Sequence, residues 1–298
     1  MKNSNLLIAL SKGLKVAIEK IDDDTVEWVK GVPGNPVWAS IAVKGIREIE
    51  ASMAGFLTKQ KKLYIKRLKK LKLPVKKADT VEEALIEAFK KMITDKILND
   101  DEAQIKSLQE SISEWELPII EKVAQEILIL LDPDKEMKDL SKAVIQWLKD
   151  HVIKFAQEVQ ETTHKAVIDA LTTAFKKGKG IEEMANLMEG LFDFSRERAK
   201  MVARTEVIAA CNAGTLEGYR QSEVVVGKRW VAVMDSRTRG THRKANGQVK
   251  KLDEPFIVGG YKMMHPGDSS LGAPAKEVIH ERCTTEPVLE GEEPELDK

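Results

Sequence analysis

Residues 201–220 read MVARTEVIAACNAGTLEGYR and carry a clear helical pattern. Side chains suited to packing recur every three or four positions, so they share one face of a helix. That face comprises Val202, Thr205, Ala209, Asn212, Leu216 and Tyr219. The small residues nearby, which would permit the close approach of another backbone, are Ala209, Ala210, Ala213 and Gly214. Ser195 is placed to cap this helix, which we expect to end near Gln221.

Helical patterns also dominate the sequence on the N-terminal side of this segment. Pro36 follows the N-cap residue Asn35 and opens a helix that we expect to run to Leu73, because Pro74 then stops it. Its apolar face consists of Trp38, Ile41, Ile49, Met53, Phe56, Tyr64, Leu68 and Leu71. Another amphipathic pattern covers residues 6–20.

Further helices are expected between this long helix and Ser195. One begins near Asp79, where Thr80 and Glu83 have the form of a capping box. The others cover about 102–131, 137–176 and 181–192, with a break or kink at Pro118 and a turn at Asp132-Pro133-Asp134.

The character of the sequence changes at Gly227, after which short strands alternate with turns rich in Gly, Pro and Asp. Strands are expected near residues 229–234, 261–264 and 282–288. The sequence therefore predicts a predominantly α protein, with an extended helical N-terminal part followed by a small α+β C-terminal domain. We place these parts at residues 1–160 and 161–290, followed by an acidic, disordered tail at 291–298.

Composition narrows the classes of partner. Lys and Arg total 48, and Asp and Glu also total 48, so the chain has no net charge that would attract nucleic acid. Nucleic acid could therefore bind only at a local basic patch. The two cysteines, Cys211 and Cys283, suit a reducing compartment. No secretory signal is visible, and no stretch approaches the roughly 20 apolar residues that span a bilayer, so we expect no membrane partner.

The most basic segment lies at the end of the first long helix. Its proposed nucleic-acid-binding residues are Lys59, Lys61, Lys62, Lys66, Arg67, Lys69, Lys70 and Lys72. Such a run binds polyanions by releasing counterions and predicts non-specific contact with double-stranded DNA. Two alternatives remain at this point: a solvated face whose lysine stems cover apolar surface, and an amphipathic helix that meets a partner or a membrane surface.

The C-terminal part contains an ordered series of short motifs. They are Arg204-Thr205-Glu206, Trp230, Asp235 to His242, Gly247, Pro255-Phe256, Gly259-Gly260-Tyr261, Pro266-Gly267-Asp268 and Arg282-Cys283-Thr284. In this order they resemble the phage Mu F-like head morphogenesis family, over about residues 165–290. Residues 1–160 show no comparable resemblance.

The resemblance implies a minor head protein that works in virion assembly and DNA delivery. Such proteins are associated with the portal inside the phage head, after assembly in the host cytoplasm. The implied partners are the portal protein, packaged double-stranded DNA and, further, the scaffold or major capsid protein. The implied function is head morphogenesis with a part in DNA packaging or ejection.

This chain departs from the family at the positions that look like a zinc site. Arg239 and His242 stand where a first pair of cysteines would be, and Glu281 replaces the first cysteine of the closing motif. A mixed site of Asp235, His242, His280 and Cys283 would still suit zinc. The alternative is an ion pair between Arg239 and Glu281 in place of metal.

We favour a structural polar cluster without a cofactor, with no catalytic residue. Its members are Arg204, Glu206, Asp235, Arg237, Arg239, His242 and Cys283. The competing interpretation is a metal-dependent nuclease or hydrolase that uses Asp235, His242 and His280. Against an enzyme, the sequence has no nucleophile elbow, phosphate loop or His-Glu-x-x-His helix.

Overall fold

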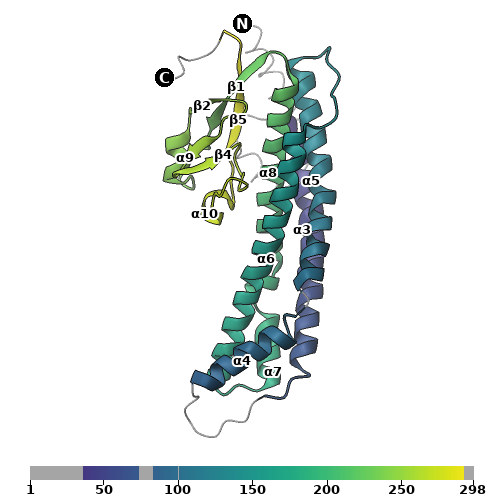
Figure 1. Ribbon diagram of the computed structural model, residues 1–298, viewed down its shortest axis with the longest axis vertical. Coiled ribbons are helices and arrows are strands. Elements are labelled where there is room, and N and C mark those ends of the chain that lie inside the picture. The colour runs from purple at the N-terminus through teal and green to yellow at the C-terminus, as the bar shows by residue number, and fades with distance from the viewer. Residues whose placement is uncertain (1–35, 74–82, 100, 292–298) are drawn as a thin grey trace. The chain divides into compact units, whose positions relative to one another are not determined.

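The computed structural model of the chain describes residues 36–73, 83–99 and 101–291, and confirms a predominantly α fold (Figure 1). The helices are α3 (Pro36–Leu68), α4 (Glu83–Lys96), α5 (Asp101–Leu131), α6 (Lys142–Lys176), α7 (Ile181–Glu189), α8 (Arg196–Gln221), α9 (Gly240–Ala245) and α10 (Ala275–Val278), with a 3-10 turn at Phe192–Phe194. The strands are β1 (Val225–Val231), β2 (Val249–Lys251), β3 (Phe256–Val258), β4 (Tyr261–Met263) and β5 (Thr284–Leu289).

The described residues form two compact units, each assembled from separate segments. The first unit comprises the described residues up to Ile49, Ser113–His151 and the described residues from Met201 onward. The second comprises Glu50–Ile112 and Val152–Lys200. The boundary expected at residue 160 lies inside the continuous helix α6, so the linear division of the sequence does not coincide with these units.

The first unit is built around α8. Every residue from Thr205 to Tyr219 is buried, which explains why this helix is not amphipathic in the usual sense. A Cβ atom at Gly214 would lie 2.6 Å from the carbonyl oxygen of Ile120 in α5. One at Gly218 would lie 2.7 Å from the Ile127 side chain. The small residues of α8 therefore do permit the close backbone approach that the sequence indicates.

The other side of α8 meets the C-terminal module, which consists of residues 225–291. Strand β1 lies between β2 and β5 in a three-stranded antiparallel sheet, and β3 pairs with β4 in a separate hairpin. The Tyr219 hydroxyl donates to the carbonyl of Thr285 at 2.9 Å, and the Asn212 amide donates to the carbonyl of Cys283 at 3.1 Å. These bonds attach β5 and its leading residues to the helix.

The core of the module contains few but large side chains. Trp230, Phe256 and Met263 are fully buried, and the rings of Trp230 and Phe256 meet edge to face with centroids 5.3 Å apart. The β3–β4 turn has Gly259 and Gly260 at positive φ, a conformation that glycine adopts without steric cost. The Trp-containing strand and the Gly-Gly-Tyr stretch of the sequence thus form parts of one core.

The described part of the second unit contains helices and the short segments that join them, and no strand. Phe89 of α4 stacks on Phe175 of α6 with ring centroids 4.2 Å apart. The buried Gln60 side chain of α3 donates to the Gln160 amide oxygen of α6 at 2.7 Å. The apolar stripe of α3 is used in such packing, since Met53, Tyr64 and Leu68 are fully buried.

Several element boundaries differ from the sequence prediction, through local backbone bonds or through tertiary contacts. Helix α3 ends at Leu68 instead of Leu73, where amide groups bond three residues back and tighten the last turn. Helix α6 begins at Lys142 instead of near 137, because Glu217 of α8 accepts hydrogen bonds from the Ser141 amide and hydroxyl. Ser141 then caps the helix through Val144.

The sequence predicts a break or kink at Pro118, but the helix does not end there: α5 continues through it from Asp101 to Leu131. A proline inside a helix costs about 3 kcal/mol through its missing hydrogen bond and its ring clash. The turn that follows it is buried against α8, with Ile120 and Val123 fully buried. We attribute the continuity of the helix to this packing.

Strand β1 covers Val225–Val231 instead of 229–234, because its pairing with β5 begins at Val225 opposite Leu289. Helix α7 ends at Glu189, before the expected residue 192. The capping of α8 by Ser195 is confirmed, since its hydroxyl accepts from the Arg198 amide at 3.1 Å. The expected elements at 6–20, Asn35, Asp79–Thr80 and 292–298 lie outside the described residues.

None of the helices within the described ranges combines the length and the apolar character that a membrane crossing requires.

Replacing Gly214 with Ala tests the contact between α8 and α5. The added methyl would meet the Ile120 carbonyl oxygen and the Val123 side chain, at 2.6 and 2.9 Å, and neither can move without shifting α5. We expect the free energy of unfolding to fall by about 2–3 kcal/mol, measured by urea denaturation.

Gly55→Ala is the matched control, because nothing lies within 4 Å of a Cβ atom at that helical glycine. This variant should be more stable than the parent by about 0.5–1 kcal/mol. Equal effects from the two substitutions would show that the approach of α8 to α5 is not close.

Candidate functional site

The segment after β1 is held by a bidentate ion pair between Asp235 and Arg282. The two guanidinium nitrogens donate to the two carboxylate oxygens at 2.8 and 2.7 Å. The Asp235 carboxylate also accepts from the Arg237 amide at 2.9 Å, so it closes the turn that follows. The hydrogen bonds from Arg282 lower the pKa of Asp235, which therefore stays ionised and engaged.

His242 is the centre of a buried cluster in the C-terminal module. Helix α9 places its ring at 1% exposure, with Nδ1 2.7 Å from Glu281 and Nε2 3.2 Å from Glu277. Burial disfavours the charged ring, but the hydrogen bond and negative charge of Glu281 outweigh burial and raise the pKa of His242. The two carboxylates therefore favour the protonated, imidazolium form of the buried ring.

Cys283 completes this cluster, with its Sγ 3.5 Å from Nδ1 of His242. Burial, reinforced by the charge of Glu281, raises the pKa of the thiol, so the thiolate is disfavoured. The other oxygen of Glu281 accepts from the amides of Arg282 and Cys283 at 2.7 and 2.6 Å. Glu281 therefore holds the closing motif to α9 through both of its oxygens.

The alternative ion pair between Arg239 and Glu281 does not form. Arg239 donates to the carbonyl of Ile279, and Glu281 faces His242. His280 also lies apart from the cluster: its ring is exposed, its backbone has φ 57°, and its amide donates to Thr205 at 3.2 Å. Partial desolvation and the nearby charge of Arg204 lower the pKa of His280.

The structure thus brings together two of the four residues that the sequence suggests as metal ligands. His242 and Cys283 lie with Glu281 in a group whose ligand atoms are within 4.8 Å of one another, and that group includes neither Asp235 nor His280. Glu277, which also reaches His242, was not foreseen. It lies in the short helix α10, which is brought to His242 by the tertiary fold and has no sequence motif that marks it.

Glu206 of the Arg-Thr-Glu motif belongs to a second buried cluster. Its carboxylate lies 2.6 Å from Nε2 of His151 in α6, and the same nitrogen lies 3.5 Å from Glu116 in α5. Burial raises the pKa of Glu116 to about 8. Neither His151 nor Glu116 was expected at a site, because each lies in a helical stretch without a motif. Glu206 therefore lies where α5, α6 and α8 meet.

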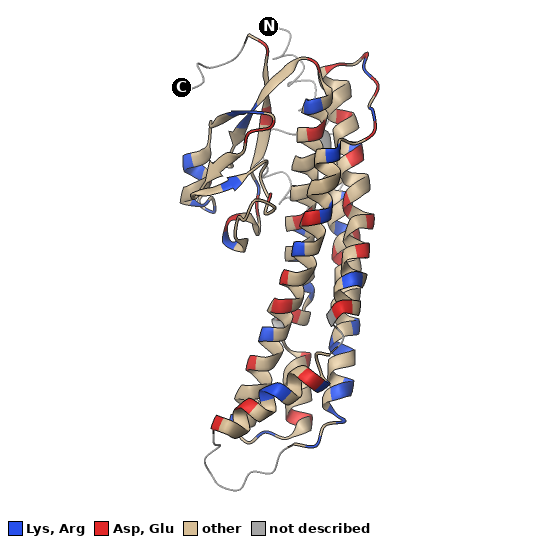
Figure 2. Ribbon diagram, viewed as in Figure 1, with Lys and Arg blue, Asp and Glu red and all other residues tan. Residues whose placement is uncertain are grey.

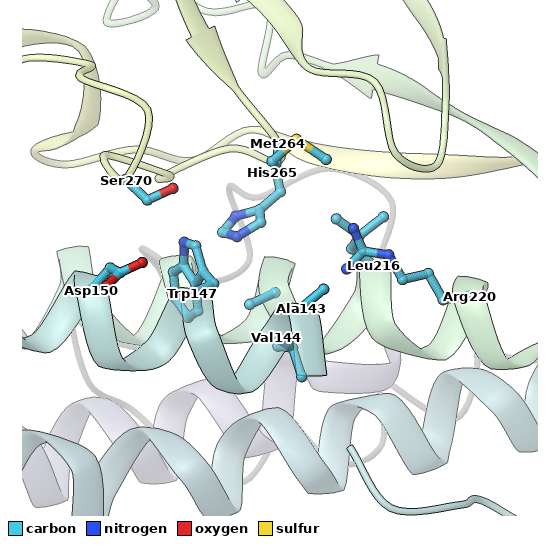
Figure 3. A pocket seen from close by; sticks show the side chains of 10 residues that line it. Ala143, Val144, Trp147, Asp150, Leu216, Arg220, Met264, His265 and Ser270 are labelled. Carbon is cyan, nitrogen blue, oxygen red and sulfur yellow. The ribbon is translucent and has the colours of Figure 1, made fainter. Parts of the chain in front are cut away.

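A pocket of about 240 Å³ lies between α6, α8 and residues 264–270 (Figure 3). Its lining includes Val144 and Trp147 of α6, Leu216 of α8, and His265. Burial lowers the pKa of His265 to about 4, and its ring meets Trp147 edge to face with centroids 4.9 Å apart. No residue of the expected site lines this pocket, so it is separate from both polar clusters.

Figure 2 shows the positions of Lys and Arg along the ribbon in blue, including those at the end of α3. The side chains of this basic run are divided between paired and exposed ones. Lys61 lies 2.8 Å from Glu189, Lys69 lies 3.0 Å from Glu182, and Arg67 donates to the carbonyl of Ile97 at 2.7 Å. The exposed members that form no ion pair within the described part of the chain are Lys59, Lys62, Lys66, Lys70 and Lys72. These five make up the exposed basic patch.

The fold and the site define a mainly helical protein with a small C-terminal module held by ion pairs, of which those of His242 are buried. Residues 165–286 match the family described as Phage Mu protein F like protein. The chain is also 30% identical over 286 residues to the uncharacterized protein YqbB of Bacillus subtilis strain 168, a match that covers 94% of this chain and 90% of that protein. This chain belongs to the phage Mu F-like family, as its motifs indicate.

Two further relatives match a smaller share of the chain. The minor head protein GP7 of Bacillus phage SPP1 is 31% identical over 131 residues, which are 43% of this chain and 41% of GP7. The NAD(+)–arginine ADP-ribosyltransferase EFV of Enterococcus faecalis is 30% identical over 135 residues, 44% of this chain and 27% of EFV. The chain thus spans less than half the length of either protein. No solved structure shows significant similarity to the chain.

A double-mutant cycle on His242 and Glu281 tests the buried ion pair. His242→Ala would leave Glu277 and Glu281 as buried carboxylates without their cation, and we expect it to cost about 3 kcal/mol of unfolding free energy. Glu281→Gln should relieve part of that cost, so the two changes should be non-additive by about 1–3 kcal/mol in urea denaturation. Strictly additive effects would show that the pair contributes no coupling.

The buried His265 predicts a pH-dependent stability. Its pKa is about 4 in the folded protein and 6.5 ordinarily, so between these values the unfolded chain binds a proton that the folded protein does not. Stability therefore falls as the pH falls from 6.5 to 4, by about 3 kcal/mol from this residue. His265→Phe, which packs on Trp147 without titrating, should lose this part of the slope. If the dependence of stability on pH is unchanged in the variant, groups other than His265 cause it.

Proposed function

We propose that this protein is a minor component of a phage head that acts in head morphogenesis. The observation that carries the proposal is family membership together with the match to a protein named minor head protein GP7. We place the protein inside the virion and next to the portal, after assembly in the host cytoplasm. The portal protein is its proposed main partner, with the scaffold or major capsid protein as further contacts.

The way the family segment uses its polar residues supports an assembly role. Asp235 and Arg282 bind each other through both oxygens and both nitrogens, and His242 is enclosed by two carboxylates. Polar groups that bind one another in this way stabilise the module and do not point toward a substrate. The module would then serve as a rigid body that presents its outer surface to neighbouring head proteins.

The same contacts argue against a hydrolase that uses Asp235, His242 and His280. The Asp235 carboxylate is held by Arg282, the His242 ring is 1% exposed, and His280 is absent from the group formed by His242, Glu281 and Cys283. The match to EFV covers 27% of that protein, so its transferase name is no basis for an activity here. Incubation with DNA and Mg²⁺, Mn²⁺ or Zn²⁺ should give no cleavage; cleavage abolished by His242→Gln would establish the enzyme instead.

We propose further that the His242 cluster needs no zinc. Both ring nitrogens face carboxylates, at 2.7 and 3.2 Å, so the imidazolium supplies the positive charge that a metal would otherwise bring. Elemental analysis of tag-free protein before and after Cys283→Ser is the test. Zinc that is present in the parent and lost in this variant would replace the ion pair with a metal site.

Packaged DNA is a proposed partner of the exposed basic patch. The chain is neutral overall, so any binding should be weak, independent of sequence and steep in salt, with a log–log slope of about −0.9 for each phosphate contacted on duplex DNA. Changing Lys59, Lys62, Lys66 and Lys70 to Gln should flatten that slope, measured by fluorescence anisotropy over a salt series.

A matched control removes the same charge elsewhere. Lys106, Lys122, Lys149 and Lys165 are exposed lysines of α5 and α6, and their change to Gln should leave the slope nearly unaltered. If the control flattens the slope as much as the patch variant does, binding follows net charge and not the patch. Equal binding by the parent and the patch variant at every salt concentration would remove the patch from the proposal.

The head assignment itself is tested by deleting the gene in the parent phage. We expect heads of normal appearance with much reduced infectivity, and we expect an antibody to detect the protein in wild-type particles only after the heads are opened. Crosslinking in assembled particles should join the protein to the portal protein. Infectious particles at normal yield without the protein would contradict the proposed function.

A further inference from the structure

Three helices of the first unit each contribute one buried ligand-type side chain to a single point. Glu116 comes from α5, His151 from α6 and Glu206 from α8. Their ligand atoms all lie within 4.8 Å of one another, and the side chains are 0%, 4% and 3% exposed. This cluster is separate from the His242 cluster and has no part in the proposed function.

The contacts within the cluster leave one carboxylate unsatisfied. Nε2 of His151 can carry one proton, and it lies 2.6 Å from Glu206 but 3.5 Å from Glu116. Neither oxygen of Glu116 has a hydrogen-bond partner among the described residues. A buried carboxylate without donors costs several kcal/mol in general, and one imidazolium cannot serve both acids at close range. A bound group that accepts electron pairs from all three side chains would give Glu116 the partner that it lacks.

We propose that Glu116, His151 and Glu206 bind a divalent first-row transition-metal ion such as Zn²⁺. One imidazole nitrogen and two carboxylate oxygens form a mixed ligand set that suits such an ion better than Ca²⁺ or Mg²⁺, which prefer oxygen ligands alone. The ion would balance two carboxylate charges with no proton on the ring. Because the ligands come from three helices, the metal would tie α5, α6 and α8 together.

The surroundings of His151 orient it for this role. Trp147, one helical turn before it, stacks on the ring with centroids 4.7 Å apart and an interplanar angle of 15°. The Trp147 indole is itself fixed, because Nε1 donates to Asp268 at 3.0 Å. The ring plane is therefore set by packing, as second-layer contacts commonly do for metal-binding histidines. Full burial of the ligands indicates a structural site that is filled as the protein folds.

The test is to refold tag-free protein with excess Zn²⁺ or Co²⁺, remove free metal by gel filtration, and measure the bound metal and the melting temperature. We expect about one metal per chain and a melting temperature about 5–10 °C above that of protein refolded in EDTA. The bound Co²⁺ should show ligand-field bands without thiolate-to-metal charge transfer, because the site contains no cysteine.

Two isosteric variants locate the metal. Glu116→Gln and Glu206→Gln should each retain at least tenfold less metal and lose the metal-dependent rise in melting temperature. In EDTA, Glu116→Gln should melt no lower than the parent, since it replaces a buried acid whose oxygens have no hydrogen-bond donor. Cys283→Ser is the control for the His242 cluster and should keep both the metal and the shift.

Three outcomes would overturn the proposal: no metal retained by the parent, equal retention by Glu116→Gln, or loss of metal in Cys283→Ser. The last result would also place the ion in the His242 cluster, where a thiolate charge-transfer band would confirm it. If Glu116→Gln failed to refold, the Co²⁺ spectrum and the stoichiometry of the parent and of Cys283→Ser would decide the question.

Discussion

The close approach of α8 to α5 is the constraint on which the first unit depends. At Gly214 a single methyl group would come within 2.6 Å of a backbone oxygen of α5, so the two helices can lie together only where side chains are absent. Close contact on this side leaves the opposite side of α8 for the C-terminal module. There the Tyr219 hydroxyl and the Asn212 amide bind the backbone of the closing strand and its approach. One buried helix thus serves two packing interfaces.

This position explains why the module can be small. Its two sheets have three and two strands, which would be marginal if they had to form a core alone. Packing on α8 completes the burial of the module's core. The ion pairs Asp235–Arg282 and His242–Glu281 fix the loops that lie outside the strands. The polar residues of the motifs could be taken for catalytic residues from the sequence alone, but in the structure they bind one another.

The two histidine clusters illustrate different solutions to the burial of acid groups. His242 has a carboxylate oxygen beside each ring nitrogen, and Glu281 also accepts two backbone amides through its other oxygen. His151 presents a single nitrogen to both Glu116 and Glu206, and one acid is left without a donor. The geometry of the ring nitrogens, and not the residue types, makes the second cluster the better candidate for an ion.

The sequence by itself determined the helical class, the capping of α8 by Ser195, the family and the small residues that allow close packing. These features depend on local periodicity, on single capping residues and on motif order, which are written in neighbouring positions. Only the tertiary structure decided that α5 continues through Pro118, that Glu217 sets the start of α6, and that Glu281 faces His242 and not Arg239. Such contacts join residues far apart in the chain, and their energies depend on burial and distance, which no local pattern encodes.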